Sequence, residues 1–216
     1  MKLKRFLLII FICNPILLFS QIRAGWGGDA AMYTNYDYGT FMGHYSIARS
    51  WLMNRNFSVS LGAMFSYARL DLPGLQTADA HYYFDDEYVG RLNVLTSATY
   101  TLPIFKIAGI YASASAFAEP IPFNYIGIEK HTATSIDKSK GKFVFTRFTP
   151  GAFIDVGIYT DCKKNDGIFK IFVGVGYGWH DPVPDYRNAR FDGQKLSAGF
   201  SDKKNMYRIT IKIMGF

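Results

Sequence analysis

The spacing with the clearest catalytic potential in this chain of 216 residues is His44-Tyr45-Ser46. On a β-strand, residues two apart share a face, so the imidazole could activate the hydroxyl as a nucleophile. The alternation of the surrounding segment places the large apolar side chains on the opposite face, namely Phe41, Tyr45, Ile47 and Trp51. His44 and Ser46 therefore belong to the polar side of the strand, and catalysis remains an alternative rather than the first expectation.

Residues that bind metals are not grouped in the sequence. The histidines fall in four different segments without a ligand spacing between them: His44, His81, His131 and His180. The acidic run Asp85-Asp86-Glu87 lacks the alternation and the glycine of a calcium-binding loop. The two cysteines, Cys13 and Cys162, form neither a disulfide framework nor a zinc motif. We therefore expect no metal and no cofactor.

The amino terminus has the features of a secretory signal peptide over residues 1–20. Lys2, Lys4 and Arg5 precede an apolar run of 14 residues from Phe6 to Phe19. This run is shorter than the ~20 residues that cross a bilayer as a helix. Removing it takes three basic groups from a net charge of +7. The remaining charge is too mild to indicate a nucleic-acid partner.

The rest of the chain, residues 21–216, reads as one all-β domain. Twenty glycines and an aromatic content of 17% accompany segments in which apolar and polar residues alternate with a period of two. In residues 57–68, for example, Phe57, Val59 and Leu61 alternate with small or polar residues. Eight strands are expected, at 24–34, 41–53, 57–68, 88–100, 104–117, 142–160, 168–179 and 203–216. The facing of 41–53 and of 104–117 is left open.

The connections between these segments indicate an up-and-down antiparallel arrangement. From the second connection onward, short turns alternate with long loops, at 54–56, 69–87, 101–103, 118–141, 161–167 and 180–202. One end of the sheet therefore carries tight turns and the other carries elaborate loops. With an even number of strands, both chain termini lie at the end with the short turns.

Composition distinguishes a membrane barrel from a soluble one. The polar face of the segments consists mainly of Gly, Ser, Ala and Thr, which make a poor water-facing surface but a good interior for a narrow eight-stranded barrel. Segments of about 12 residues exceed typical soluble strands. Aromatic residues cluster near the segment ends, as expected for the two girdles at membrane interfaces. We therefore expect a transmembrane β-barrel with its termini in the periplasm.

By this pattern the sequence resembles the small eight-stranded outer-membrane barrels of Gram-negative bacteria, of the OmpX, OmpW and OmpA-barrel kind. That family ends in an alternating apolar strand with a terminal aromatic residue that the barrel-assembly machinery recognises. Tyr207, the isoleucines 209, 211 and 213, and Phe216 resemble this signal, although Phe216 is one residue out of phase. A local bulge at Gly215 would restore the phase.

The same resemblance sets the catalytic alternative in context. Outer-membrane lipid A deacylases carry a His-x-Ser pair on the lipid face of a strand late in the chain. Here the pair His44 and Ser46 occurs early, on the interior face. A lipid A-modifying enzyme is therefore an alternative to a protein without catalytic activity.

The alternation also directs several charged side chains into the barrel lumen. They are Asp29, Arg91, Lys106, Arg147, Asp155, Lys170, Arg208 and Lys212. Charges in a narrow lumen are normally paired, so we expect a plug rather than an ion path. The excess of six basic over two acidic groups in this set is unexplained unless acidic residues of the loops or water contribute.

Function is expected in the long loops. The segment 121–128 is unusually apolar for an exposed loop, which fits a binding surface and equally fits packing over the barrel mouth. Its candidate binding residues are Phe123, Tyr125 and Ile126. We expect a monomeric outer-membrane protein that is envelope-structural or binds partners through its loops. The expected partners are membrane lipid, lipopolysaccharide and the barrel-assembly machinery, with no nucleic acid. A narrow transporter of small or hydrophobic solutes is the second alternative.

Overall fold

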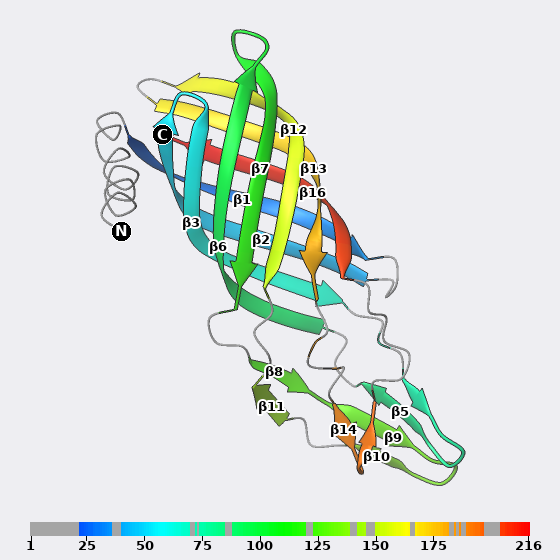
Figure 1. The fold of residues 1–216 in the computed structure, drawn as a ribbon. Coiled ribbons are helices and arrows are strands. Elements are labelled where there is room, and N and C mark those ends of the chain that lie inside the picture. Colours follow the sequence, from blue (N-terminus) through cyan, green and yellow to red (C-terminus); the bar gives the residue numbers. More distant parts are fainter. Residues whose placement is uncertain are drawn as a thin grey trace, which may run out of the picture.

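The computed structural model contains a closed antiparallel barrel of eight strands. The structure describes residues 22–35, 40–69, 72, 74–84, 88–119, 123–138, 142–145, 150–164, 167–181, 184, 186, 189–196 and 204–216. The barrel strands are β1 (Arg23–Asn35), β2 (Thr40–Asn54), β3 (Phe57–Arg69), β6 (Tyr88–Pro103), β7 (Ala108–Ala118), β12 (Gly151–Lys164), β13 (Gly167–His180) and β16 (Asn205–Gly215). Each barrel strand pairs with the next barrel strand along the chain, and β1 pairs with β16 to close the barrel (Figure 1). The expected eight-stranded up-and-down architecture is confirmed.

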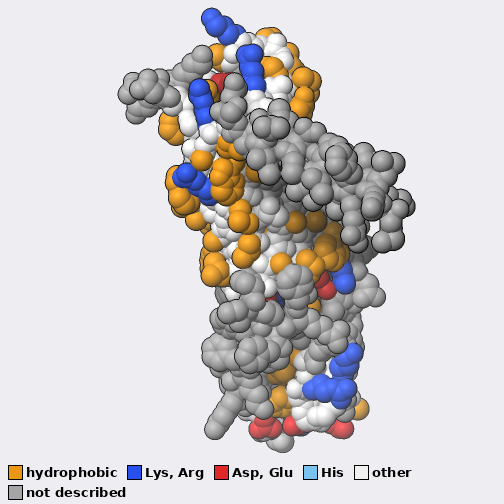
Figure 2. All heavy atoms as spheres, turned by 60° about the vertical axis from the view of Figure 1, so that its left-hand side comes forward, with side chains coloured by type: hydrophobic (Ala, Val, Ile, Leu, Met, Phe, Trp, Pro, Cys, Tyr) orange, Lys and Arg blue, Asp and Glu red, His pale blue; other side chains and the backbone are white. Residues whose placement is uncertain are grey.

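The alternation in sequence becomes an alternation between interior and exterior. On β16, Ile209 and Ile211 are exposed while Arg208 and Thr210 are buried. On β12, Ile154, Val156 and Ile158 are exposed, and Phe153 and Asp155 are buried. The barrel thus carries an apolar belt outside and a polar and aromatic interior, the reverse of a water-soluble barrel. Figure 2 shows hydrophobic side chains over this part of the surface.

The two segments whose facing was open now have a defined orientation. On β2, Tyr45 and Ile47 point outward and His44 points inward. On β7, Ile110 is exposed while Tyr111, Ser113 and Ser115 are buried. Ser113 and Ser115 therefore belong to the interior face of 104–117.

Two differences from the expected strand boundaries affect the architecture. The expected strand 142–160 contains two described strands in different sheets, and the second begins directly after Pro150, which offers no N–H for a sheet ladder. Its first part, β11 (Lys142–Phe145), pairs with β8 (Phe123–Ile126) in a separate small sheet. At the other end of the barrel β6 continues through Pro103, so that the turn to β7 lies at 104–107 instead of 101–103. The backbone N–H groups of Ile104 and Phe105 both donate to the Ala108 carbonyl and close this turn.

The long loops form small sheets beyond one end of the barrel (Figure 1). A four-stranded sheet, here called the distal sheet, has the order β10 (Ile136–Lys138), β9 (Ile128–His131), β5 (His81–Phe84) and β4 (Leu75–Gln76). The hairpin β14 (Arg190–Phe191) and β15 (Gln194–Lys195) turns at Asp192 and Gly193, both with positive φ. Asp-Gly is a preferred pair for such a two-residue turn.

The hydrophobic core extends from the barrel into these loop sheets. Phe117 and Phe153 inside the barrel belong to the same buried cluster as Tyr82, Tyr186 and Leu196 of the loop region. Lys130 on β9 donates a hydrogen bond of 2.9 Å to Asp192, which raises the pKa of the lysine. Contacts between segments far apart in sequence therefore hold the loops together. Among the described residues, no helix is long and apolar enough to cross a membrane.

Candidate functional site

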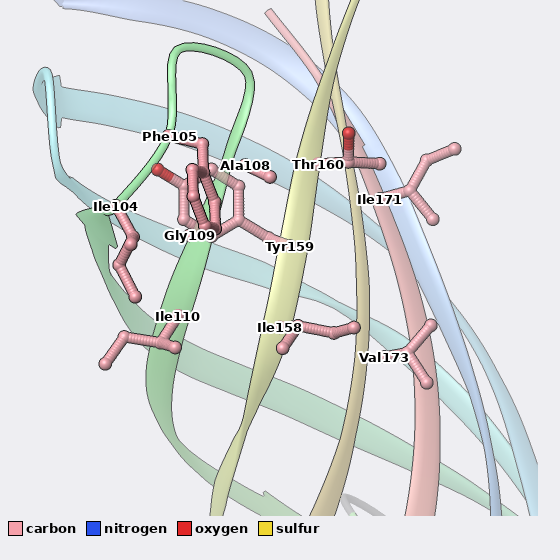
Figure 3. Close-up of a pocket in the computed structure, with 10 residues that line it drawn as sticks. All are labelled: Ile104, Phe105, Ala108, Gly109, Ile110, Ile158, Tyr159, Thr160, Ile171 and Val173. Carbon is pink, nitrogen blue, oxygen red and sulfur yellow. The ribbon is translucent and has the colours of Figure 1, made fainter.

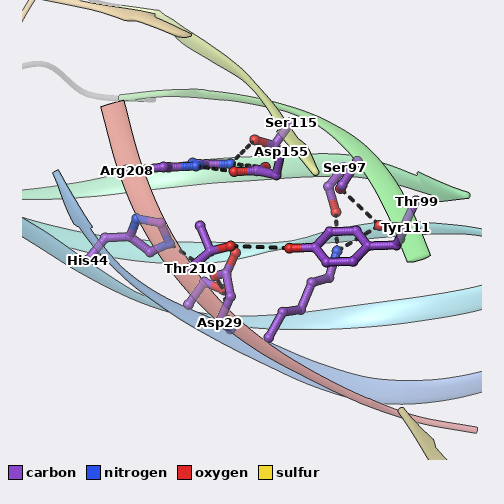
Figure 4. A network of polar contacts seen from close by, with 12 residues as sticks. Asp29, His44, Ser97, Thr99, Tyr111, Ser115, Asp155, Arg208 and Thr210 are labelled. Atoms are coloured by element: carbon purple, nitrogen blue, oxygen red, sulfur yellow. Dashed lines mark hydrogen bonds and ion pairs between the residues drawn. The ribbon is translucent and has the colours of Figure 1, made fainter. Parts of the chain in front are cut away.

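The densest polar cluster in the described structure lies inside the barrel (Figure 4). Asp29 comes from β1, Asp155 from β12, and Arg208 and Lys212 from β16. Period-two alternation places Arg208 and Lys212 on one face of their strand. Barrel closure puts Asp29 of β1 in register with Lys212, and Asp155 lies level with Arg208 on the far side of β13. The cluster thus contains two acidic and two basic groups.

Arg208 is the centre of this network. Its Nε donates to Asp155 Oδ1 at 2.7 Å and its Nη2 to Asp155 Oδ2 at 2.5 Å. Nη2 also donates to Ser115 Oγ at 2.7 Å, and Nη1 donates to the Tyr33 hydroxyl at 3.2 Å. The guanidinium carbon lies 4.4 Å from the centre of the Phe153 ring. A buried guanidinium with these partners is a fixed structural element rather than a mobile charge.

The residues of the catalytic alternative lie beside this network in an arrangement of their own. His44 is 1% exposed; its Nδ1 lies 2.5 Å from the Tyr33 hydroxyl and its Nε2 lies 3.1 Å from Asp29 Oδ1. The Ser46 hydroxyl donates to the same Asp29 oxygen. Histidine and serine therefore meet at the carboxylate of Asp29 instead of bonding to each other. The contact between base and nucleophile that would activate Ser46 is replaced by a shared acceptor.

One assignment of hydrogens satisfies this chain of contacts. The Tyr33 hydroxyl accepts from Arg208 and donates to His44 Nδ1, which leaves a neutral imidazole to donate from Nε2 to Asp29. The hydrogen bonds then run from Ser46 through Asp29, His44 and Tyr33 to the Arg208–Asp155 pair. All six side chains are held by neighbours on different strands.

Lys212 extends the network toward the other side of the lumen. Its ammonium donates to Ser97 Oγ at 3.2 Å and to Thr99 Oγ1 at 2.9 Å. Cavities of about 10 Å³ remain beside Lys212 and beside Arg208. A space of that size holds about one water molecule. At this level the described lumen is filled by side chains.

Two further ion pairs account for basic residues that the sequence left without partners. Arg91 Nη1 lies 3.3 Å from Glu119 Oε2 near the loop end of the barrel. Lys170 Nζ lies 3.3 Å from Asp161 Oδ1 near the short turns, 4.7 Å from the centre of the Tyr159 ring. Glu119 and Asp161 were expected in connections, at 118–141 and 161–167. β12 extends through Lys164, which brings Asp161 into the barrel wall, whereas Glu119 directly follows the last residue of β7 at the loop end.

Lys106 does not lie in the lumen, contrary to the expectation. It is exposed in the turn at 104–107, because β7 begins only at Ala108. Arg147 lies outside the described residues, as do the acidic residues at 85–87 and the predicted signal peptide at 1–20. Asp29, Arg91, Asp155, Lys170, Arg208 and Lys212 are placed inside the barrel.

The loop candidates Phe123, Tyr125 and Ile126 form part of β8, whose backbone pairs with β11. This segment is thus a strand in a small sheet rather than an irregular loop. Phe216 exchanges two backbone hydrogen bonds with Ile168, at 3.0 and 3.2 Å, and packs beside the interior cluster of Tyr111, Tyr159, Phe172 and Met214. The register of β16 with β13 runs without a shift through Gly215, so the proposed bulge is absent there.

The distal sheet brings together two histidines that are far apart in sequence. His81 on β5 and His131 on β9 are directly opposite each other. Tyr83 stacks with His81 and meets His131 edge-on, and His131 Nε2 lies 2.9 Å from Glu129. Within the described ranges, no group of three or more His, Cys, Asp or Glu side chains is placed to hold a metal ion.

No protein-family model matches the chain, and no curated protein sequence matches it. Solved structures do match. Neisserial surface protein A (NspA) is 8% identical with a TM-score of 0.47, over 90% of this chain and 98% of that one. The N-terminal β-barrel domain of Pseudomonas aeruginosa OprF is 10% identical with a TM-score of 0.37, over 91% and 100%. Ail, the attachment invasion locus protein of Yersinia pestis, is 11% identical with a TM-score of 0.34, over 90% and 97%.

With TM-scores below 0.5 and identities of 8–11%, these matches carry no conclusion about function, and the fold is taken from this chain's own structure. The closure of the sheet, the antiparallel order and the strand number are observed directly in this chain. The protein has the fold of the small eight-stranded outer-membrane β-barrels.

Proposed function

We propose that the protein is a non-enzymatic component of a bacterial outer membrane, in which the barrel anchors small loop sheets at the cell surface. The exposed apolar belt supports the membrane location. Ile158 is 65% exposed and Ile209 is 61% exposed in the isolated chain. A continuous belt of such residues is stable against lipid but unfavourable against water. The loop sheets then face outward, and the short turns face the periplasm.

The observation that carries the proposal is the filled interior. The Arg208–Asp155 pair, Tyr33, His44 and Asp29 occupy the centre of the barrel, and the cavities beside them measure about 10 Å³. An ion path through this interior would have to separate the Arg208–Asp155 pair. Leaving one charge of a buried pair without its partner costs roughly 3–5 kcal/mol. The barrel is therefore proposed as an anchor, and binding is assigned to its loops.

The proposal is tested first by fractionation and conductance. The protein should resist extraction with alkaline carbonate and fractionate with the outer membrane. In planar bilayers the purified protein should give no stepwise conductance, with a porin as the positive control. Steady channel openings would favour the transporter instead. Recovery in the aqueous periplasmic fraction would remove the basis for a membrane role.

The catalytic alternative has its own test. Mass spectrometry of lipid A from cells with and without the protein should give the same acylation pattern. If the pattern changes, the Ser46→Ala variant decides whether the pair of His44 and Ser46 is responsible, with Ser50→Ala as a matched interior control. Ser50 lies on the same strand and shares a hydrogen bond with Ser60 at 2.8 Å.

A further inference from the structure

A groove lies on the outer surface of the barrel near the short-turn end (Figure 3). Its volume is about 330 Å³, within the size range of small-molecule sites. Ile104 and Phe105 of the turn form one end, and Ile110, Ile158 and Val173 form the sides. Ala108 and Gly109 leave space between these larger side chains. The groove is almost entirely apolar and opens away from the lumen.

The turn that forms the end of the groove is held in place by backbone hydrogen bonds. The Ile107 carbonyl accepts from the Asp161 N–H at 2.7 Å and from Thr160 Oγ1 at 3.1 Å. The turn is therefore fixed to β12 across the groove. Its side chains nevertheless point outward, and Phe105 is 71% exposed. A fixed apolar turn at the edge of the belt is a preformed surface for a hydrocarbon ligand.

The fully exposed charges around this end of the barrel are basic, whereas the partly buried Asp161 carboxylate is paired with Lys170. Among the described residues of the short-turn end, the exposed charged side chains are Arg23, Arg55 and Lys106. Lys and Arg side chains project at this end in Figure 2. Lys106 lies between Phe105 and Ile107 in the turn that forms the groove. An ammonium beside an apolar groove is complementary to a lipid with an anionic headgroup.

We propose that this groove binds one acyl chain of an anionic phospholipid in the leaflet at the short-turn end, with the lipid phosphate against Lys106. The inference rests on the proposed membrane placement. An apolar groove at the depth of the belt is filled by hydrocarbon rather than by water. The turn then presents its cation at the level of the headgroups. The groove makes this lipid a bound neighbour rather than one that exchanges freely with bulk lipid.

The test uses Cys162, an exposed free cysteine on β12. It lies two residues beyond Thr160 on the same strand, so it reports on the groove. The full chain with Cys13→Ser is labelled at Cys162 with a small fluorophore and reconstituted in phosphatidylcholine vesicles. Trace phosphatidylglycerol or trace phosphatidylcholine, each with a nitroxide near the headgroup, then serves as the quencher. Phosphatidylglycerol should be preferred by about fivefold, the ratio expected for one lysine at the membrane surface.

Two pairs of variants separate a built site from general attraction. Lys106→Gln and Ala108→Phe should each abolish the preference, the first by removing the ammonium and the second by filling the groove. The controls Arg55→Gln and Ala112→Phe should retain it, because the first removes an exposed cation at the same end and the second enlarges an alanine on the outer face of β7, both outside the groove. Equal quenching by the two lipids in the unaltered protein overturns the proposal, as does an equal loss in Arg55→Gln or Ala112→Phe. Failure of the protein to float with vesicles overturns the membrane placement itself.

Discussion

Arg208 and Asp155 form a two-point ion pair across the barrel interior, from strands that are not adjacent. β13 lies between β16 and β12, and Gly176 of β13 is in register with both residues. A Cβ atom on Gly176 would lie 2.2 Å from Asp155 Oδ1. The glycine therefore provides the space through which the guanidinium reaches the carboxylate.

Removing one partner of this pair should strongly destabilise the barrel. Arg208→Met or Asp155→Leu alone should lower the free energy of unfolding by roughly 3–5 kcal/mol, because each leaves a buried charge uncompensated. The double variant should lose less than the sum of the two single variants. Urea unfolding in lipid vesicles measures all three, and Arg23→Gln, an exposed site, should change stability little. Strict additivity would show that the two residues act independently.

A methyl group at Gly176 should disturb the same pair without removing any charge. Gly176→Ala should cost roughly 1–3 kcal/mol, since overpacked interiors must shift side chains or backbone. At Gly90 a Cβ would meet the Phe65 ring at an ordinary 3.4 Å. Gly90→Ala should therefore be close to neutral in the same unfolding assay. If the two alanines have equal effects, strand propensity rather than packing determines the result.

The Tyr33 hydroxyl bonds to both Arg208 and His44, so removing this hydroxyl should change the surroundings of both side chains. Tyr33→Phe should cost roughly 1–3 kcal/mol, because His44 Nδ1 loses a donor in a buried site. Tyr45→Phe is the control, since Tyr45 lies on the next strand and points outward. Imidazole nitrogen chemical shifts of labelled His44 should change in Tyr33→Phe and not in Tyr45→Phe. Unchanged shifts would remove Tyr33 from the network.

Because Ile211 and Lys212 point to opposite sides of β16, the barrel should tolerate substitutions at these two positions differently. Ile211 is exposed in the apolar belt, whereas the Lys212 side chain points to Ser97 and Thr99. Ile211→Arg should impair assembly by roughly 2–4 kcal/mol, the cost of a basic residue at the lipid midplane. Lys212→Ile should be tolerated much better. The yield of folded barrel, from its mobility in unheated gels, compares the two; equal impairment would contradict the assigned facing.

The loop between β7 and β12 should be removable without loss of the barrel. Deleting 120–140 removes β9, the strand between β5 and β10, so the distal sheet should disappear and proteases should cleave more readily near 70–84. Any surface binding should weaken. Deleting 119–140 also removes Glu119, 3.3 Å from Arg91, and should be less stable than the shorter deletion. A barrel that fails to fold after the shorter deletion would show that the loop sheets are part of its folding unit.

Much of the barrel was determined by the sequence alone. Period-two alternation places Ile209 and Ile211 on one face and Arg208 and Lys212 on the other wherever β16 pairs, because successive side chains on a strand point to opposite sides. The start of β12 at Gly151 is also marked in the sequence, by Pro150 directly before it. The hairpin at Asp192 and Gly193 had a local signal as well, within the segment 180–202 that was expected only as a long loop.

Partner choice was decided only by the tertiary structure. Arg91 meets Glu119, the residue directly after β7, and Lys170 meets Asp161, which lies in β12 because that strand extends beyond its expected end at 160. Serine and histidine at positions 46 and 44 share a face as the sequence predicts, yet both bond to Asp29 of the neighbouring strand. Local alternation fixes the direction of a side chain, whereas its partner depends on barrel closure and register. Those are set by contacts between segments that are distant in the chain.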